Sequence, residues 1–365
     1  MKGVIAVVPG DGIGPEICRS AVAVLSAVNK RFSHQITATT ALAGGDVFEK
    51  LGEHLPQETI EVCEKSDAIL FGAVGGPTDA QENPKWKDAE KNVILRLRKK
   101  FDLFANLRPL RVWSGTESFS ALKPELIQNM DVLIVRELVS GIYFGPRRRY
   151  EEKGEAVAED TNRYTWREIE RVMRVAFEAT TNRNKKLTVV DKANVLETSR
   201  LWREVAEAVR KDFSGITMEY MFVDNAVMQL ARNPVAFDVI VTENMFGDIL
   251  SDLGGAIVGS LGLLPSASLS SRGGSASGGN EKKFGLYEPS HGSAPDIAGK
   301  NVANPTAQIL SLALLLRYTY GLEKEAAAIE EAILFALKAG DKTKDLGGNL
   351  STEEFASCVV NRLTP

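Results

Sequence analysis

The chain has 365 residues, with 44 lysines and arginines against 48 aspartates and glutamates, and a formal net charge of −4 at pH 7. Its length exceeds the size at which a single hydrophobic core usually keeps growing, so the sequence predicts two domains. The balanced charge provides no overall attraction to nucleic acid or to an anionic membrane. It leaves room for a local positive cleft that binds a small anionic ligand.

The three cysteines, Cys18, Cys63 and Cys358, lie far apart and form no CxxC or Cys/His group. This pattern argues against a disulfide framework and a zinc site, and it indicates a reducing compartment such as the cytoplasm. The N-terminus has no signal-like apolar region, and no apolar run reaches the roughly 20 residues of a membrane span. The longest run, residues 309–316, predicts a buried core helix.

The chain opens with a predicted strand at residues 4–8, a glycine-rich turn and a helix, with Pro15 suited to the first helical turn. The turn is similar to the dinucleotide fingerprint G-x-G-x-x-G, but Pro15 stands where the third glycine is required. An ordinary Rossmann site is therefore disfavoured. The turn is either structural or in contact with a ligand.

Arginines and apolar residues alternate in the segment after Glu90. Glu90, Ile94 and Arg98 follow at four-residue steps, which predicts one shared helix face. Such a face could bind a carboxylate through arginine and an alkyl group through Ile94 and Leu95. The alternative is a solvated basic helix with a core stripe, which the charge run alone favours.

Four predicted buried strands are each followed by charged residues. These residues are Arg136 after residues 132–135, Asp191 and Lys192 after 187–190, Asp224 after 220–223, and Asp248 beyond 237–241. In an open α/β sheet, ligands bind beyond the carboxyl ends of the strands. The repeated charges therefore favour a binding site over chance solvation.

The stretch TENMFGDILSDLGG, residues 242–255, places two carboxylates at helical spacing. A helix that begins near Phe246 puts Asp248 and Asp252 on one face, where they can share a hard cation, although solvated helix acids show the same spacing. With Asp224 they form a set of three aspartates that suits Mg²⁺ or Mn²⁺.

The basic residues of the predicted site suit an acidic substrate. Arg98, Arg108 and Arg136 suit a molecule with two carboxylates, and Lys192 can shuttle protons. The run Arg147–Arg149 has no interleaved aromatic platform, so we do not expect nucleic acid to bind there.

Two loops follow in the C-terminal part. Residues 270–283, SSRGGSASGGNEKK, predict a flexible low-complexity loop. Residues 284–305 predict a long irregular loop with one histidine, His291, and a lone carboxylate, Asp296. Long irregular loops often carry function, whereas a lone histidine is more often structural.

Six motifs, which lie between residues 9 and 305, are PGDGIGPE, LRKKFDLFANLRP, VRELVSGIYFG, VDKANVL, NMFGDILSDL and EPSHGSAPDIAGKNVANP. Through them the chain resembles the β-decarboxylating dehydrogenases, the family of isocitrate and isopropylmalate dehydrogenases. The resemblance implies a two-domain α/β fold with a mixed sheet that is not a Rossmann fold. The implied first domain, mainly cofactor-binding, is 1–103 and 259–365. The second, for substrate, metal and dimerisation, is 104–258, with an arm near 144–165.

The resemblance also implies a role for individual residues. The implied catalytic acid/base pair is Tyr143 and Lys192, and the metal ligands are Asp224, Asp248 and Asp252. The implied substrate-binding residues are Arg98, Arg108, Arg136, Asp224, Ile94 and Leu95. The implied cofactor-binding residues are Ile13, Glu90, His291, Gly292, Ser293, Ala294, Pro295, Asp296 and Asn304. A homodimer is implied, in which Lys192 and Asp224 complete the partner's site.

The implied cofactors are NAD and Mg²⁺ or Mn²⁺. Asp296 matches the acid that binds the adenosine ribose of NAD, whereas the NADP-dependent relatives carry basic residues in this loop. The implied reaction is the oxidative decarboxylation of (2R,3S)-3-isopropylmalate to 4-methyl-2-oxopentanoate and CO₂ in leucine biosynthesis. Isocitrate, homoisocitrate and tartrate are alternative substrates on the same scaffold. A non-catalytic regulatory subunit is an alternative of another class, which the intact Tyr143, Lys192 and aspartates disfavour.

Overall fold

The computed structural model describes residues 1–80, 82–273 and 283–364. The chain divides into two compact units. Unit 1 comprises Met1–Leu103, Trp113–Ala121 and Val258–Pro365, and unit 2 comprises Phe104–Val112 and Leu122–Ile257.

These units differ from the predicted boundaries in one segment. The sequence places residues 113–121 in the second domain, but they belong to unit 1, as does Val258. The segment packs on the C-terminal part of the chain: the Lys342 ammonium lies 4.7 Å from the centre of the Phe119 ring. A Cβ added at Gly259 would lie 2.2 Å from the Phe119 carbonyl oxygen, so the two backbones are in close contact.

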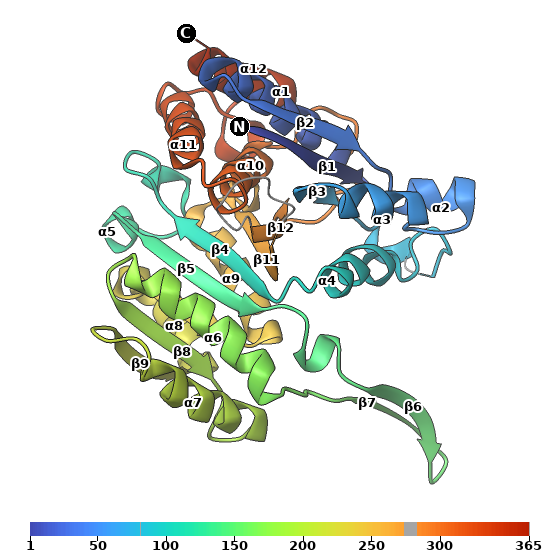
Figure 1. Cartoon of the computed structure of the whole chain (residues 1–365), viewed down its shortest axis with the longest axis vertical. Coiled ribbons are helices and arrows are strands. Elements are labelled where there is room, and N and C mark those ends of the chain that lie inside the picture. Colours follow the sequence, from blue (N-terminus) through green and yellow to red (C-terminus); the bar gives the residue numbers. More distant parts are fainter. Residues whose placement is uncertain (81, 274–282, 365) are drawn as a thin grey trace. The chain divides into compact units, whose positions relative to one another are not determined.

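Unit 1 contains five strands built from both ends of the chain. In sheet order they are β2 (Gln35–Thr40), β1 (Lys2–Gly10), β3 (Ala68–Ala73), β12 (Lys283–Pro289) and β11 (Pro265–Gly273) (Figure 1). The first four run parallel, and β11 runs antiparallel to β12. The predicted mixed sheet is therefore confirmed.

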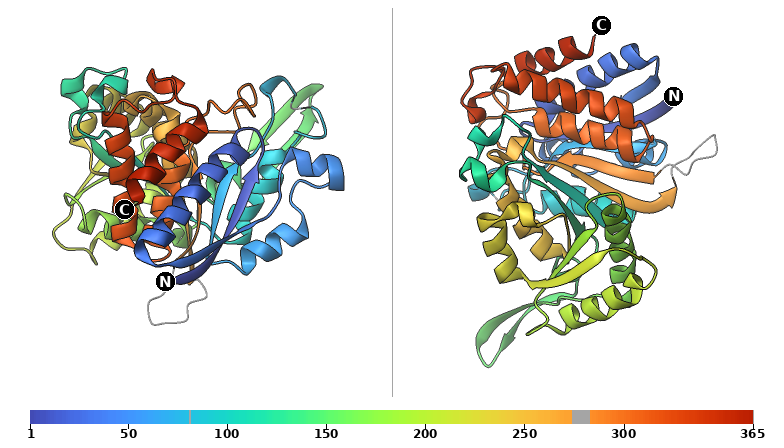
Figure 2. Two further views of the ribbon diagram at one scale, coloured as in Figure 1. Left: turned by 90° about the horizontal axis from the view of Figure 1, so that it is seen from above. Right: turned by 90° about the vertical axis from the view of Figure 1, so that its left-hand side faces the viewer.

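Helices cover both faces of these strands. One group packs together on one face, as both views of Figure 2 show: α1 (Gly14–Phe32), α10 (Thr306–Tyr318), α11 (Glu323–Lys338) and α12 (Thr352–Leu363). Residues 306–316 of α10 are all buried, which confirms the predicted core helix. The core on the other face includes residues of α3 (Gln57–Glu64) and α4 (Arg96–Lys100), and α2 (Gly45–Leu51) precedes α3.

The segment that contains Glu90 and Ile94 is not a regular α-helix. Residues Lys91–Leu95 form a π-helix, and α4 follows directly. Glu90, Ile94 and Arg98 therefore follow one another along a π-turn and an α-turn, and they differ in burial: Glu90 is exposed, Ile94 is buried and Arg98 is partly buried. Ile94 is buried in the core of unit 1, and Leu95 is half-buried against that core.

Unit 2 contains five further strands. In sheet order they are β4 (Ala105–Arg111), β5 (Asp131–Glu137), β10 (Val239–Thr242), β8 (Lys186–Asp191) and β9 (Thr217–Phe222). The last four run parallel and β4 runs antiparallel to β5. Their carboxyl ends therefore share one edge, as the sequence predicts. Arg136 lies inside β5 rather than after it.

The helices of unit 2 also lie on both sides of its strands. On one face α6 (Trp166–Thr181) and α7 (Glu197–Arg210) pack together. The others are α5 (Pro124–Ile127), α8 (Val223–Arg232) and α9 (Asn244–Val258). The helix with the two aspartates, α9, begins two residues before the predicted start at Phe246.

The predicted arm contains an antiparallel ribbon of β6 (Arg147–Glu152) and β7 (Glu155–Asp160), most of whose side chains are exposed. Two of its arginines form ion pairs across the ribbon, Arg147 with Asp160 and Arg148 with Glu159.

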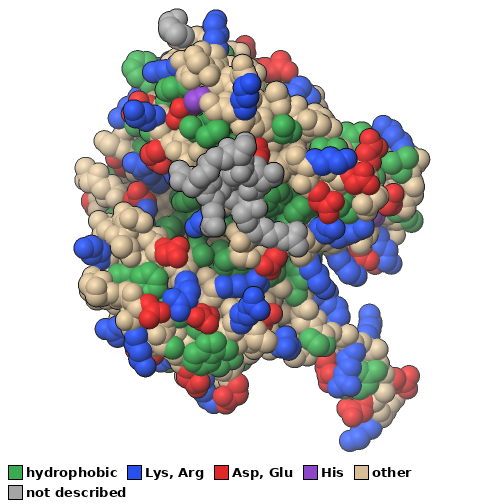
Figure 3. All heavy atoms as spheres, in the orientation of Figure 1, with side chains coloured by type: hydrophobic (Ala, Val, Ile, Leu, Met, Phe, Trp, Pro, Cys, Tyr) green, Lys and Arg blue, Asp and Glu red, His purple; other side chains and the backbone are tan. Residues whose placement is uncertain are grey.

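On the face drawn in Figure 3, basic and acidic side chains are interspersed. Within the described ranges, no helix has the length and apolar character needed to cross a membrane.

The two predicted C-terminal loops are shorter than expected. Strand β11 continues to Gly273 and β12 starts at Lys283, so the remainder of the predicted flexible loop, residues 274–282, lies outside the described residues. Strand β12 also takes residues 284–289 out of the predicted irregular loop. The irregular part is therefore residues 290–305.

Candidate functional site

Strands β4 and β5 present polar side chains on one face of unit 2. Side chains alternate between the faces of a strand, so Asn106 and Arg108 share a face of β4. Asn106 pairs with Arg136 of β5 across the antiparallel ladder, which places Arg136 on the same face. Arg136 is almost fully buried and Arg108 nearly so. A buried guanidinium needs compensating partners, and helix α9 provides them.

Helix α9 lies against this face because glycine allows a close approach. A Cβ added at Gly247 would lie 2.6 Å from Cγ of Arg136, and one at Gly254 would lie 2.4 Å from Cδ2 of Leu110. Four polar residues of α9 are spaced three or four residues apart and share the adjoining side of the helix. These residues are Asn244, Asp248, Ser251 and Asp252.

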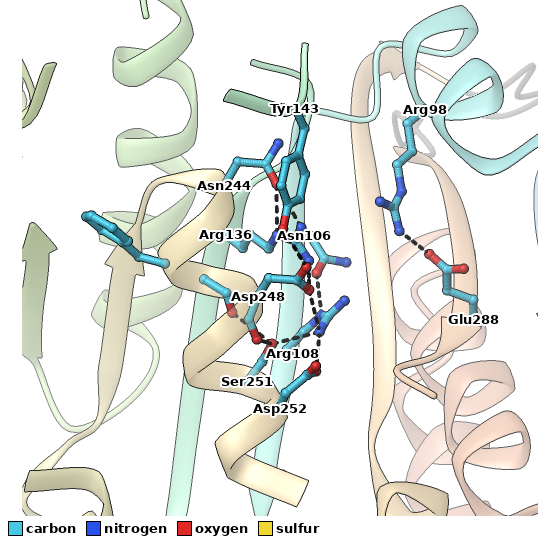
Figure 4. Close-up of polar contacts among 12 residues, drawn as sticks. Arg98, Asn106, Arg108, Arg136, Tyr143, Asn244, Asp248, Ser251, Asp252 and Glu288 are labelled. Carbon is cyan, nitrogen blue, oxygen red and sulfur yellow. Dashed lines mark hydrogen bonds and ion pairs between the residues drawn. The ribbon is translucent and has the colours of Figure 1, made fainter. Parts of the chain in front are cut away.

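The arginines and α9 form a connected cluster (Figure 4). Arg108 donates to Asn106 Oδ1 at 2.9 Å and to Ser251 Oγ at 2.7 Å. Its Nη1 lies 3.5 Å from a carboxylate oxygen of both Asp248 and Asp252. The cluster therefore holds two aspartates within reach of one guanidinium.

Arg136 has two partners on α9. Its Nε and Nη2 donate to Asn244 Oδ1 at 3.1 and 2.8 Å, and its Nη1 donates to Asp248. The Asp248 side chain is about one-third exposed and the Asp252 side chain is more than half exposed. The arginines are thus held in place by their hydrogen bonds, while the two carboxylates remain partly exposed and accessible to a ligand.

Tyr143 joins the cluster from a short 3-10 helix, Gly141–Tyr143. Its hydroxyl donates to Asp248 Oδ2 at 3.1 Å, and the Arg136 guanidinium lies 5.8 Å from the centre of its ring. Burial, followed by the negative charge of Asp248, raises the pKa of Tyr143 above its usual value. Such a hydroxyl stays protonated at neutral pH and can act as an acid.

The pair Asp248 and Asp252 has the oxygen donors that Mg²⁺ and Mn²⁺ prefer. Burial raises the pKa of Asp252, and the charge of Asp248 adds to this, while Arg108 lowers it. A cation would relieve that repulsion, so the residues fit a divalent metal. Among the described residues no group of three or more His, Cys, Asp or Glu could hold a metal.

Lys192 and Asp224 interact with each other. Lys192 follows β8, and Asp224 lies in the first turn of α8, directly after β9. Since β8 and β9 are parallel neighbours, their carboxyl ends bring the two together, and Lys192 Nζ donates to Asp224 Oδ1 at 2.5 Å. This hydrogen bond lowers the pKa of the Asp224 carboxyl.

Arg98 lies in unit 1, on α4. Its Nη2 donates to Glu288 of β12 at 2.9 Å, and both side chains are only about 11% exposed (Figure 4). The Arg98 Nε is buried and has no hydrogen-bond partner among the described residues. A donor without a partner in a nearly buried arginine is costly, so a ligand oxygen at this position would be stabilising.

The glycine turn of unit 1 contacts the C-terminal loop. The Ile13 N–H donates to the Ser293 carbonyl at 2.8 Å, and a Cβ at Gly12 would lie 1.9 Å from that oxygen. Only glycine fits this contact, and Gly12 also has a positive φ of 59°. The structure thus brings together Ile13 and Ser293, two predicted cofactor residues.

Asp11 links the glycine turn to the backbone near Glu90. It is buried and accepts the backbone N–H groups of Gly45 at 2.8 Å and Gly75 at 3.1 Å. Glu90 lies over Gly75, because a Cβ there would lie 2.6 Å from Glu90 Oε1. Burial raises the pKa of both Asp11 and Glu90.

The loop 291–304 carries the other predicted cofactor residues. His291 Nδ1 donates to the Gly292 carbonyl at 2.9 Å, and burial lowers its pKa, which favours neutral imidazole. Asp296 is exposed and free to meet ribose hydroxyls. The Asn304 side chain is instead occupied within the fold, since it donates to Asp345 at 3.0 Å and accepts from the Thr306 N–H. The exposed acid and the open loop at Gly292, where a Cβ would meet nothing within 4 Å, fit a nucleotide.

Sequence reasoning missed the residues that hold these groups in place. They are Asn106, Asn244 and Ser251 in unit 2, and Asp11 and Glu288 in unit 1. For Asn244 and Ser251 a signal exists, because both share the helical spacing of Asp248. For Glu288 and Asp11 the partners are distant in the sequence, and spacing carries no signal.

The family of the chain is shown by its similarity to known proteins over nearly the whole length. The family model described as isocitrate/isopropylmalate dehydrogenase matches residues 4–359. The chain belongs to this family, and its fold is the two-unit α/β fold of that family.

Individual members of the family show how similar the chain is to particular enzymes. The chain is 52% identical to 3-isopropylmalate dehydrogenase of Priestia megaterium, over 98% of this chain and 94% of the relative. It is 54% identical to 3-isopropylmalate dehydrogenase of Geobacillus kaustophilus, over 96% and 93%. Among solved structures, isocitrate dehydrogenase from Methylococcus capsulatus matches over 100% of both chains, with 34% identity and a TM-score of 0.86.

Proposed function

We propose that the chain is an NAD-dependent enzyme that converts 3-isopropylmalate to 4-methyl-2-oxopentanoate and CO₂, a step of leucine biosynthesis. The observation that carries this proposal is the unit 2 cluster, in which two arginines, two aspartates and Tyr143 are joined by hydrogen bonds and ion pairs. It occurs in a chain about half identical to relatives named 3-isopropylmalate dehydrogenase.

The arginines suit the two carboxylates of this substrate. Arg108 and Arg136 are held in fixed orientations by Asn106, Ser251 and Asn244, so a carboxylate can bind without ordering them first. Arg98 has a donor to spare and is proposed as the third substrate arginine. Asp224 is proposed as a further substrate-binding residue.

For the isopropyl group we propose Leu95 as the main contact. Leu95 is half-buried and retains exposed apolar surface, whereas Ile94 is used mostly within the core of unit 1. An apolar contact there favours an alkyl group and leaves a third carboxylate without a partner. Ile94 would then act mainly by fixing the position of Leu95.

The proposed metal ligands are Asp248, Asp252 and Asp224 of the partner subunit. The proposed NAD site comprises Ile13, Glu90, the loop from His291 to Asp296 and the backbone at Asn304. When bound, NAD accepts a hydride from C2 of the substrate, and Mg²⁺ or Mn²⁺ stabilises negative charge on the substrate oxygens. Asp296 at the adenosine ribose would favour NAD over NADP, because a 2′-phosphate would meet a carboxylate.

The protein side chains handle the protons. Lys192 takes the proton of the C2 hydroxyl as the hydride leaves C2. The bond to the β-carboxylate then breaks, CO₂ departs, and the electron pair stays on C3. Tyr143 donates its proton to C3, and its raised pKa keeps that proton available.

We further propose that the chain is a cytoplasmic homodimer. The exposed β6–β7 ribbon would clasp the partner, and Lys192 and Asp224 would complete the partner's site. The absence of a third carboxylate beside Asp248 and Asp252 in one chain, among the residues described, supports a shared site.

The test is NADH production by the purified chain with Mg²⁺ and NAD, using 3-isopropylmalate, isocitrate and D-malate at matched concentrations. We expect kcat/KM for 3-isopropylmalate to exceed the others by at least about tenfold, since a buried isopropyl group contributes a few kcal/mol. A preference for isocitrate would contradict the role of Leu95. No turnover with any acid would favour a regulatory subunit.

A further inference from the structure

Asn244 is the first residue of α9 and is fully buried. Its Oδ1 accepts two hydrogen bonds from Arg136, at 3.1 and 2.8 Å. Its Nδ2 donates to the Ser140 carbonyl at 3.0 Å. The orientation of the amide is unambiguous, because a guanidinium only donates and a carbonyl only accepts.

The amide therefore joins three parts of the cluster. Arg136 comes from β5, and Ser140 directly precedes the 3-10 helix that carries Tyr143. Asp248 lies one turn further along α9 and contacts both Arg136 and Tyr143. One side chain thus sets a substrate arginine, the proton donor and a metal ligand relative to one another.

A hydrogen bond of its backbone also holds Asn244 in place. Its backbone N–H donates to the hydroxyl of Tyr164 at 3.0 Å, and Tyr164 in turn donates to Glu243 at 3.2 Å. Tyr164 packs closely on Gly141, where a Cβ would lie 2.3 Å from its oxygen. The start of the Tyr143 turn is thus held from two directions.

We propose that Asn244 is a positioning residue for the proposed reaction: its side-chain amide aligns Arg136 for the substrate carboxylate and Tyr143 for proton delivery to C3. This inference rests on the proposed function. The asparagine amide offers an acceptor oxygen to Arg136 and a separate donor nitrogen to the Ser140 carbonyl, two atoms that face different partners at the same time. Aspartate has the same shape, but its ionised form offers a second acceptor that opposes the Ser140 carbonyl.

The test compares Asn244→Asp with the wild type and with Asn182→Asp. Asn182 follows α6, is exposed, and donates its amide to the Glu178 carbonyl at 3.2 Å, so its substitution makes the same chemical change far from the cluster in sequence. We expect Asn244→Asp to lower kcat and raise KM for 3-isopropylmalate, with kcat/KM reduced about 100-fold, because misplaced reacting groups lose about that much. NAD affinity should change less than about twofold. Asn182→Asp should match the wild type in every constant.

Two further measurements keep the outcome decisive. If Asn244→Asp does not fold, Asn244→Ala removes the three side-chain hydrogen bonds without adding charge and should likewise lower kcat and raise KM. A crystal structure of the variant should show the Tyr143 hydroxyl beyond hydrogen-bond distance of Asp248, a readout that needs no turnover. A variant with wild-type kcat and KM, or with the Tyr143 to Asp248 contact intact, would overturn the role of Asn244. A wild type that does not oxidise 3-isopropylmalate would contradict the proposed function alone.

Discussion

At the scale of single residues, the chemistry depends on how burial changes proton affinity. Tyr143 is partly buried beside the negative charge of Asp248, and both effects disfavour its anion. The same environment would make a strong base of the phenolate, but the hydrogen bond to Asp248 requires the protonated form. Tyr143 is therefore suited to give a proton and not to take one.

Replacement of Tyr143 by Phe tests this assignment. We expect kcat with 3-isopropylmalate to fall about 10²-fold or more, the usual contribution of a positioned acid, with KM within a few-fold because the ring remains. Steady-state NADH production measures both constants. Tyr150→Phe on the arm, which removes a hydroxyl bonded to Glu159, serves as the control. An equal loss in both variants would contradict a specific role for Tyr143.

Glu137 provides a prediction on pH and stability. It is fully buried next to Arg136, and burial raises its pKa to about 7, although the Val139 and Ser140 N–H groups lower it. The folded chain therefore binds this proton more tightly than the unfolded chain. The bound proton contributes its full stabilisation below about pH 4.5, and this contribution is lost as the pH rises to about 7. At about 1.4 kcal/mol per pH unit, the free energy of unfolding falls by roughly 3 kcal/mol over this range.

Urea unfolding between pH 4.5 and 9.5, followed for wild type and Glu137→Gln, measures this effect. The variant has no such proton, so its free energy of unfolding should depend less on pH within that window. The two curves should run parallel above about pH 8. An identical slope from pH 4.5 to 7 in both proteins would show that Glu137 does not titrate as described.

At the scale of elements, periodicity predicts some features and not others. The helix with Asp248 and Asp252 and the charges at the strand ends were predictable, because spacing alone defines a helix face and a sheet edge. The π-helix at residues 91–95 was not, since one extra residue in a turn leaves the apolar pattern nearly unchanged. The role of Gly247 was also hidden, because the contact it permits is with Arg136, more than 100 residues away.

The glycines of α9 allow a matched pair of substitutions. Gly247→Ala would place a Cβ 2.6 Å from Arg136 Cγ, whereas Gly254→Ala would place one 2.4 Å from Leu110 Cδ2. Both variants gain helix propensity and both introduce overpacking of about 1–3 kcal/mol. We expect Gly247→Ala to raise KM for 3-isopropylmalate about tenfold, through displacement of Arg136. Gly254→Ala should change the melting temperature but not KM; equal KM values in the two would contradict the packing argument.

His54 supports the π-helix next to Leu95. Its ring stacks on Phe48 with centroids 4.5 Å apart, Nε2 lies 2.9 Å from the Lys85 carbonyl, and Nδ1 lies 3.3 Å from the Asn92 amide nitrogen. We expect His54→Ala to loosen the turn and raise KM for 3-isopropylmalate severalfold. The smaller D-malate, which has no isopropyl group, should be affected less. Substrate kinetics on both acids provide the comparison, and an equal effect on both would place His54 outside substrate selection.

At the scale of the whole molecule, the six motifs predicted the family and the mixed sheet, which the comparisons and the structure confirm. The compact units differ from the predicted domain boundary at residues 113–121, which belong to unit 1, where Phe119 packs on Lys342. The site residues remain predictions in their roles. Asp11 and Glu288 could not be foreseen, since their hydrogen-bond partners are far away in the sequence and leave no periodic trace, whereas Asn244 shares the helical spacing of Asp248.

The shared site of the proposed homodimer can be tested by mixing two inactive chains. Tyr143→Phe lacks the acid and Lys192→Met lacks the base, so each homodimer should be inactive. In a mixed dimer one site contains both defects and the other contains neither. Coexpression with random pairing should therefore restore about one quarter of the wild-type activity. No restored activity in a verified mixed dimer would show that Tyr143 and Lys192 act within one chain.

The most direct test of the central claim is the product balance of a single reaction. The purified chain, with Mg²⁺, NAD and a limiting amount of 3-isopropylmalate, should form NADH, CO₂ and 4-methyl-2-oxopentanoate in equal amounts until the substrate is consumed. NADH without CO₂ would mean oxidation without decarboxylation and would contradict the decarboxylation step of the proposed reaction. The absence of all three products would contradict the proposed function.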